Sequence, residues 1–166
     1  FSGKYPISTT NFDGGLFGLR NKDKYDLVFL DAPCSGEGQI YLAGEKPLRS
    51  WSLKRIKFMT TLQKVLIKSA FSTLKKGGTM IYSTCTLEPE ENEGILKYLL
   101  ESFPKNCELE KINLVNRIEF SDYRVNVKAG LTSWNNKTYP DAVLNSIRVL
   151  PSARMMGFFV AKIKKV

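Results

Sequence analysis

The 166-residue sequence contains no histidine, the side chain most often used as a general base near neutral pH and as a metal ligand. Serine-histidine-aspartate triads, cysteine-histidine proteases and zinc sites built from Cys and His are therefore excluded within this chain. Its three cysteines argue against a disulfide framework and indicate reduced thiols, as in a cytoplasmic protein. Without histidine, two thiols are too few to ligate zinc, so we expect no metal.

Long apolar runs are also missing from the sequence. No stretch approaches the ~18 consecutive apolar residues of a membrane-spanning helix, and we expect no membrane partner. Apolar residues still make up 43% of the chain and charged residues 25%, which is the composition of a globular domain. Acidic residues are scarce beside basic ones, 16 against 25, and the resulting net charge of +9 favours a polyanionic partner such as a nucleic acid.

Two short apolar segments, residues 25–30 and 79–83, have the β-rich character of strands buried in a parallel sheet. Between them, residues 52–75 carry apolar side chains at steps of three and four, typical of one face of a long helix. Gly77 and Gly78 are expected to end this helix. The order of strand, helix and strand makes a parallel crossover the default and predicts an α/β fold.

The other segments are less regular. We expect a strand over residues 5–11 with a turn at Gly14 and Gly15, a helix from residue 88 to 103, and a strand over residues 107–112. Residues 113–145 have no sustained period and indicate a long loop or a small insertion. Residues 146–150 and 157–163 are expected to form a closing antiparallel hairpin.

Each of the two strong strands is followed by a cysteine. Asp31 and Cys34 come after the first strand and Cys85 after the second, and ligands bind outside the carboxyl ends of strands in open α/β sheets. If the strands are parallel, these three side chains emerge at one edge. Most single cysteines are packing residues, and we assign Cys107 to packing. Cys34 and Cys85 lie beside small or hydroxyl residues and are candidates for chemistry; a redox pair remains an alternative.

The motif Asp-Ala-Pro-Cys-Ser-Gly at residues 31–36, together with the run from Gly77 to Glu93 that contains Ser-Thr-Cys-Thr, resembles the paired signature of the Nop/Sun family of RNA cytosine-5 methyltransferases. The closing Arg-Val-Leu-Pro at residues 148–151 and Gly-Phe-Phe-Val-Ala at residues 157–161 are similar to the family's last motif. The resemblance implies a Rossmann-like class I methyltransferase sheet, mostly parallel with a C-terminal antiparallel hairpin.

In this family the glycine-rich cofactor loop, its lysine and the acid that holds the ribose precede these motifs. The resemblance therefore implies that the N-terminal strands are missing. Residues 1–166 would be the C-terminal portion of a catalytic domain that uses S-adenosyl-L-methionine, with an incomplete cofactor pocket. The sequence departs from many relatives at Ser152, where they carry histidine.

The resemblance also implies a role for each candidate residue. Cys85 is the nucleophile that adds to carbon 6 of cytosine, Cys34 assists its release, and Asp31 hydrogen-bonds the base while lying against the cofactor. Asp13 meets the adenine side of S-adenosyl-L-methionine. The implied partner is RNA of the bacterial ribosomal type with an accessible, splayed-out cytosine, and the full-length protein is expected to be monomeric.

Basic residues offer a further, weaker prediction. Lys54, Arg55, Lys57 and Arg148 are candidates for contacts with RNA phosphates, although a solvated helix face is the favoured explanation for the first three. The charge also leaves an alternative to catalysis open, an inactive basic RNA-binding module on a methyltransferase-like fold.

Overall fold

The computed structural model describes residues 7–39, 51–113, 126–152 and 155–166. The helices are α1 (Gly14–Arg20), α2 (Leu53–Thr73) and α3 (Glu93–Ser102), with short 3-10 helices η1 (Glu37–Gln39) and η2 (Asp141–Asn145). The main sheet contains β1 (Tyr25–Asp31), β2 (Leu74–Thr84), β3 (Cys107–Glu110), β4 (Val127–Ala129), β7 (Ile147–Val149) and β8 (Phe158–Lys165). A separate small sheet contains β5 (Ser133–Trp134) and β6 (Lys137–Thr138).

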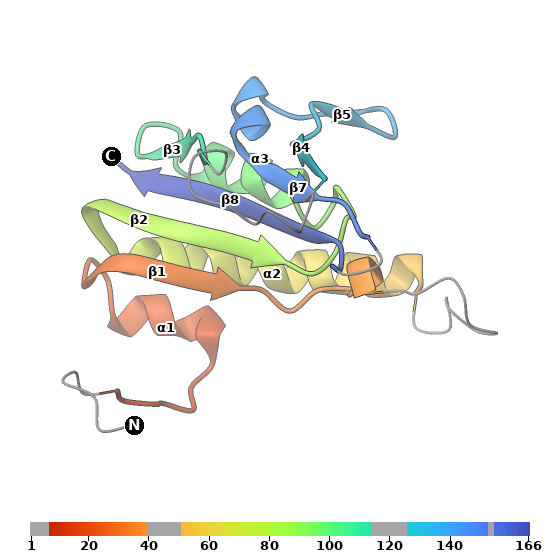
Figure 1. Cartoon of the computed structure of the whole chain (residues 1–166). Coiled ribbons are helices and arrows are strands. Elements are labelled where there is room, and N and C mark those ends of the chain that lie inside the picture. Colours follow the sequence, from red (N-terminus) through yellow and green to blue (C-terminus); the bar gives the residue numbers. More distant parts are fainter. Residues whose placement is uncertain (1–6, 40–50, 114–125, 153–154) are drawn as a thin grey trace.

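The main sheet combines parallel and antiparallel pairing (Figure 1). Strands β1 and β2 are parallel neighbours, and β8 lies antiparallel to β2. The far edge of β8 pairs with β7 near its start and with β3 near its end, both antiparallel, and β4 pairs antiparallel with β7. The predicted α/β fold and the hairpin of β7 and β8 are confirmed; within the described residues, the parallel part of the sheet is the β1–β2 pair.

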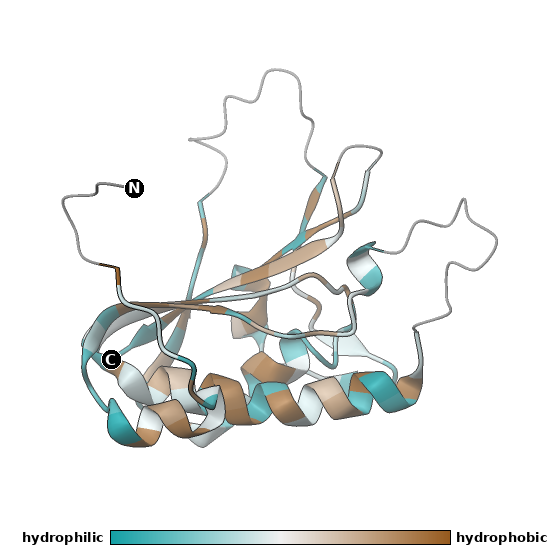
Figure 2. Cartoon of the chain, turned by 90° about the horizontal axis from the view of Figure 1, so that it is seen from below, coloured by the Kyte–Doolittle hydropathy of each residue, from teal (hydrophilic) through white to brown (hydrophobic). Residues whose placement is uncertain are grey.

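Helix α2 connects the two parallel strands and covers one face of the sheet. Its first turn is capped by Ser52, whose Oγ accepts a hydrogen bond from the Arg55 amide at 3.1 Å. Figure 2 shows apolar and polar segments alternating along α2, the pattern of a helix with one buried face. That face and α3 share one core beneath the strands, in which Ile67, Phe71 and Tyr82 are fully buried.

The predicted end of this long helix is wrong by a few residues. Helix α2 stops at Thr73, and β2 begins directly at Leu74. Gly77 and Gly78 do not cap the helix but lie inside β2, where the register with β1 is irregular. Gly77 has a φ of +78°, so its backbone freedom is used by a bulge in a strand and not by a helix end.

Helix α1 is not anticipated by the sequence pattern. The two glycines at its start were expected to form a turn, but Asp13 caps the helix by accepting a hydrogen bond from the Gly15 amide at 2.7 Å. The helix then packs closely on α2, where the Gly18 amide donates to Ser69 Oγ at 2.8 Å. Residues 7–11 do not form the expected strand, and residues 5 and 6 lie outside the described part.

Two further boundaries differ from expectation. The helix expected from residue 88 begins only at Glu93, because residues 88–92 form turns closed by backbone bonds such as Asn92 to Pro89 at 3.3 Å. The strand expected over residues 107–112 is present as β3 but ends two residues earlier, at Glu110, and Cys107 is buried in the core as predicted. Of the expected loop at 113–145, residues 114–125 lie outside the described part, whereas the rest contains β4, β5, β6 and η2.

The face of β1 that α2 leaves uncovered exposes large apolar side chains. Leu27 is 52% exposed and Phe29 is 71% exposed, although both lie in the middle of a strand of the main sheet. Within the described residues, β1 also has a partner strand on one edge only, which is β2. No helix in the described ranges is long and apolar enough to cross a membrane.

We predict that Gly18→Ala destabilises the fold by about 1–3 kcal/mol, because overpacking a tight contact forces the backbone apart. A Cβ at this position would lie 2.5 Å from the carbonyl oxygen of Ser69 on α2. Urea unfolding followed by circular dichroism measures the change. Leu19→Ala is the control, since Leu19 is 81% exposed on the same helix. Equal unfolding free energies for the two variants would contradict the prediction.

Candidate active site at the ends of β1 and β2

Strands β1 and β2 end side by side. Asp31 lies opposite Ser83 in the parallel register, and Ser83 Oγ donates a hydrogen bond to the Asp31 carboxylate at 3.1 Å. The Ala32 amide, just past the end of β1, donates to the Ser83 carbonyl at 2.9 Å. The loops that follow the two strands therefore leave the sheet at the same edge (Figure 1).

Each loop brings one cysteine to this edge. The Sγ atoms of Cys34 and Cys85 lie 2.9 Å apart, within hydrogen-bonding distance, and both thiols are half-buried. Together with Asp31 they line a cavity of about 700 Å³. The other residues that line the cavity are Ala32, Pro33, Gln39, Val149, Met155, Met156, Gly157 and Phe158. The strand order thus brings together the three side chains that sequence reasoning expected at one edge.

The surroundings of Cys34 determine its protonation state. Burial raises the pKa of Cys34 well above that of a free thiol, and the contact with Cys85 raises this pKa further. Cys34 therefore stays protonated at neutral pH and can donate its S–H to the sulfur of Cys85. The arrangement places a protonated thiol directly beside a second sulfur that can act as a nucleophile.

Asp13, the fourth candidate, lies elsewhere. Its carboxylate caps α1 through the Gly15 amide, and Asp13 is not among the residues that line the cavity. The structure therefore separates Asp13 from Asp31, Cys34 and Cys85 within the described residues.

The two cysteine loops are also joined to each other. Ser35 Oγ and Thr86 Oγ1, the hydroxyls that follow each cysteine, are hydrogen-bonded at 3.0 Å. The Gly38 amide donates to the Cys85 carbonyl at 3.1 Å, and the Gly38 carbonyl accepts from the Gly157 amide at 2.8 Å. Gly38 thus ties the Cys85 loop to the segment that enters β8.

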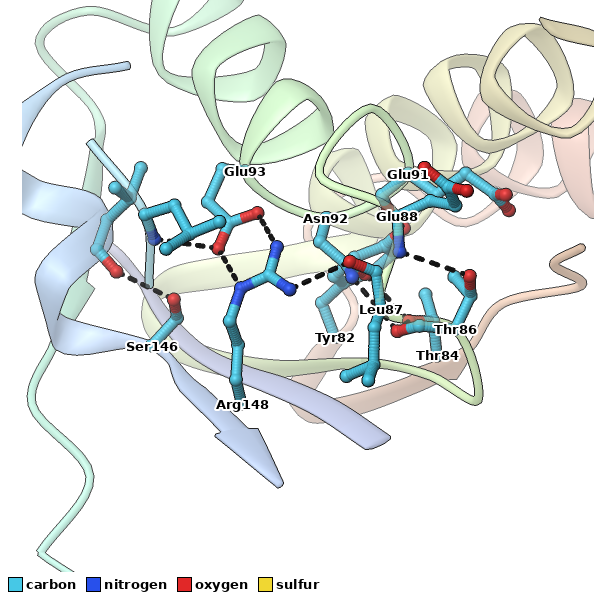
Figure 3. A network of polar contacts seen from close by, with 12 residues as sticks. Tyr82, Thr84, Thr86, Leu87, Glu88, Glu91, Asn92, Glu93, Ser146 and Arg148 are labelled. Carbon is cyan, nitrogen blue, oxygen red and sulfur yellow. Dashed lines mark hydrogen bonds and ion pairs between the residues drawn. The ribbon is translucent and has the colours of Figure 1, made fainter. Parts of the chain in front are cut away.

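Arg148 contradicts one of the sequence predictions. It was a candidate for RNA phosphate contact, but its side chain is buried and its Nε donates to the Glu93 carboxylate at 2.7 Å (Figure 3). Its Nη1 donates to the Leu87 carbonyl, also at 2.7 Å. A buried guanidinium needs such partners, and Arg148 is fully engaged inside the protein. By contrast, Lys54, Arg55 and Lys57 are exposed on α2, as a solvated helix face requires.

Sequence reasoning missed a group of buried polar residues behind the two loops. Glu91, Asn92 and Glu93 are fully buried, although their segment was expected to form the solvated first turn of a helix. Gln63, on the inner face of α2, is also fully buried and donates to Glu91 Oε2 at 2.8 Å. Their position directly after the Cys85 loop is the one sequence feature that connects them with the site. Their burial could not be predicted because their partners on α2 and β7 lie far away in sequence.

In the described ranges, no group of three or more Cys, Asp or Glu side chains lies close enough together to hold a metal ion.

The fold of the chain is similar to that of solved structures of related proteins. A crystal structure of a methyltransferase homologue from Pyrococcus horikoshii superposes with a TM-score of 0.70 at 31% identity, covering 93% of this chain and 43% of that one. A structure of NSun6 from Pyrococcus horikoshii with SFG has a TM-score of 0.64 at 26% identity, covering 95% of this chain and 34% of that one.

The family can be stated more narrowly. Residues 7–164 match the family model of the 16S rRNA methyltransferase RsmB/F, and the chain belongs to this family, which confirms the Nop/Sun resemblance. It is 36% identical over 160 residues to a tRNA (cytosine(49)-C(5))-methyltransferase of Pyrococcus abyssi, covering 96% of this chain and 48% of that protein. It is 37% identical over 158 residues to the ribosomal RNA small subunit methyltransferase F of Vibrio campbellii, covering 95% of this chain and 29% of that protein. The chain therefore spans less than half the length of these relatives.

We predict that Gly38→Ala separates the two thiols. A Cβ on Gly38 would lie 2.8 Å from the Cys85 carbonyl oxygen, so the Cys85 loop must move. Because the displaced loop carries Cys85 to a new position, the rate at which iodoacetamide alkylates Cys85 should change about threefold or more. Mass spectrometry of the alkylated peptides measures the rate. Gly94→Ala, on α3, is the control and should react as the unchanged protein does; equal rates in Gly38→Ala would refute the prediction.

Proposed function

We propose that the protein carrying this chain transfers a methyl group to carbon 5 of a cytosine in RNA. Membership of the RsmB/F family supports methyl transfer to RNA. The single observation that carries the cysteine chemistry is the pair of sulfurs 2.9 Å apart at the ends of adjacent parallel strands. Since the relatives are much longer, we propose that residues 1–166 form the C-terminal portion of the catalytic domain.

Two thiols are chemically useful for this reaction. Carbon 5 of cytosine is a weak nucleophile, and addition of a thiolate to carbon 6 turns the ring into an enamine that can attack a methyl donor. We assign the addition to Cys85, whose sulfur accepts the hydrogen bond from Cys34 when Cys34 is protonated. Afterwards the proton on carbon 5 must leave and the carbon–sulfur bond must break, with its electron pair returning to sulfur. Cys34 is adjacent to that departing sulfur and assists this second stage: it gives its own proton to the Cys85 sulfur as the bond breaks, and its sulfur takes up the proton from carbon 5.

Asp31 is the proposed contact to the base. It lines the same cavity as both thiols, and Ser83 donates to one of its carboxylate oxygens and so orients it. In this role Asp31 hydrogen-bonds cytosine at ring nitrogen 3 and the exocyclic amine, where charge develops during thiolate addition. The cytosine must leave its stack to enter the cavity, because its carbon 6 is otherwise inaccessible to a thiol.

The proposed methyl donor is S-adenosyl-L-methionine. A solved relative carries SFG, an analogue of this cofactor. The described residues fit one side of such a group, since the Asp31 carboxylate and the apolar side chains of Val149 and Phe158 line the same cavity. When bound, the cofactor supplies an electrophilic methyl group. Asp13, which we assign to the adenine side, caps α1 and does not line this cavity. Because the chain covers only part of its relatives, we propose that its cofactor pocket is incomplete.

The proposed substrate is ribosomal RNA, methylated in the cytoplasm. The family description names 16S rRNA, although one relative is named for a tRNA position. The net charge of +9 and the exposed basic residues on α2 favour a polyanionic ligand. An inactive RNA-binding module would show the same salt-dependent affinity without methyl transfer, so transfer of a labelled methyl group to RNA distinguishes the two functions.

We predict that Cys85→Ala abolishes covalent trapping on RNA that contains 5-azacytidine, because no other sulfur then attacks carbon 6. A gel that separates the protein–RNA adduct from free protein measures the trapped fraction. Cys107→Ala, which removes a thiol buried in the core, is the matched control and should trap as the unchanged protein does. Adduct that persists in Cys85→Ala would reject Cys85 as the nucleophile.

We predict the opposite result for Cys34→Ala. Addition by Cys85 continues while release is slowed, so an adduct accumulates with ordinary RNA that contains cytosine. The same gel without 5-azacytidine measures it, and the double variant Cys34→Ala, Cys85→Ala should show none. Normal turnover in Cys34→Ala would count against a role for Cys34 in release.

A further inference from the structure

Glu91 holds the Cys34 loop from behind. Its side chain is fully buried, and Oε2 accepts a hydrogen bond from the Ser35 amide at 3.0 Å. The same oxygen accepts from Gln63 Nε2 at 2.8 Å, and that nitrogen also donates to the Pro33 carbonyl at 2.8 Å. The residues on both sides of Cys34 are therefore held by the buried Glu91 carboxyl and by the Gln63 side-chain amide that donates to it.

Asn92, the next residue, holds the Cys85 loop in the same way. It too is fully buried, and its Oδ1 accepts from Thr84 Oγ1 at 2.7 Å while its Nδ2 donates to the Thr86 carbonyl at 3.0 Å (Figure 3). Thr84 and Thr86 flank Cys85 directly. Two adjacent side chains thus hold two loops that are far apart in sequence, each by the residues on both sides of its cysteine.

The backbone of this dipeptide is itself fixed to the sheet. The Tyr82 hydroxyl, from near the end of β2, donates to the Glu91 carbonyl at 2.7 Å. The following residue, Glu93, is ion-paired with Arg148 on β7 and accepts from the Leu131 amide at 2.9 Å. Neither Glu91 nor Asn92 lines the cavity, so neither touches a substrate there.

We propose that Glu91 and Asn92 are positioning residues that together set the spacing and orientation of the two thiols, Glu91 on the Cys34 side and Asn92 on the Cys85 side. The inference rests on the proposed function. A packing role alone does not account for the chemistry present: Glu91 Oε1 is buried, and no described group hydrogen-bonds to it. Burial also raises the pKa of Glu91, so the site keeps a carboxyl where its charge is disfavoured.

The two neighbouring residues should have opposite effects in the full-length protein. Glu91→Ala frees the Cys34 loop while Cys85 stays in place, so adduct with ordinary RNA should accumulate about tenfold or more, as in Cys34→Ala. Asn92→Ala frees the Cys85 loop, so the rate of adduct formation on 5-azacytidine RNA should fall about tenfold or more. The trapping gel measures both quantities in all variants.

Rescue and stability controls separate positioning from folding. Glu91→Gln keeps an oxygen that accepts from the Ser35 amide and should return adduct levels to those of the unchanged protein. Ile67→Ala, which hollows the core under the sheet, should lower the melting temperature without accumulation of adduct. If Glu91→Ala does not fold, Gln63→Ala tests the same loop, since it removes the contact with the Pro33 carbonyl, and it should give a smaller accumulation of adduct.

Different outcomes would contradict the positioning role of Glu91 and Asn92 and the proposed methyl transfer. The positioning role is contradicted if Glu91→Ala and Asn92→Ala lose adduct formation equally. It is also contradicted if both variants behave as the unchanged protein does. Absence of trapping by the unchanged protein overturns the proposed function instead.

Alkylation by iodoacetamide tests the positioning role without RNA. Glu91→Ala should raise the alkylation rate of Cys34 about tenfold and leave that of Cys85 within twofold. Equal changes in rate at both thiols would contradict separate control of the two loops.

Discussion

The parallel pairing of β1 with β2 is the constraint on which the site depends. Because Asp31 and Ser83 share a register position, the loops after both strands begin at the same edge and their cysteines come within 2.9 Å of each other. A shift by one residue would turn every side chain of the strand to the other face and separate Asp31 from the thiols. Helix α2 makes the pairing parallel by returning the chain to the start of the sheet, and through Gln63 it also reaches the Cys34 loop.

Strand pairing brings the two loops together, but buried polar groups give them their shape. Hydrophobic side chains fill the centre of the core, whereas Glu91, Asn92, Glu93 and Arg148 lie at its end beneath the cysteines. Burying such groups costs free energy unless each is hydrogen-bonded or paired. Their bonds converge on backbone groups of irregular loops, which have no strand partners to satisfy them. The network therefore gives the two loops a defined geometry.

Features that depend on local pattern could be predicted from the sequence. The apolar steps of α2, the apolar runs of β1 and β2 and the meeting of Cys34 with Cys85 all follow from periodicity and strand order. Features that depend on distant partners could not. The short helix α1 relies on contacts of Gly18 with Ser69, and acids at 91–93 look like a solvated helix start until their partners on α2 and β7 are known. Arg148 was misassigned for the same reason.

The site is also asymmetric in what surrounds it. On one side, the segment entering β8 and the loop containing Gly38 close around the thiols through backbone hydrogen bonds. On the other, Asp31 ends a strand with one free edge among the described residues and with exposed Leu27 and Phe29. The groups proposed to attack and release the base are thus held by contacts between three segments, whereas Asp31 is held, within the described ranges, by Ser83 of β2 alone. The position of the two thiols therefore depends on the loops after β1 and β2 and is independent of the exposed face of β1.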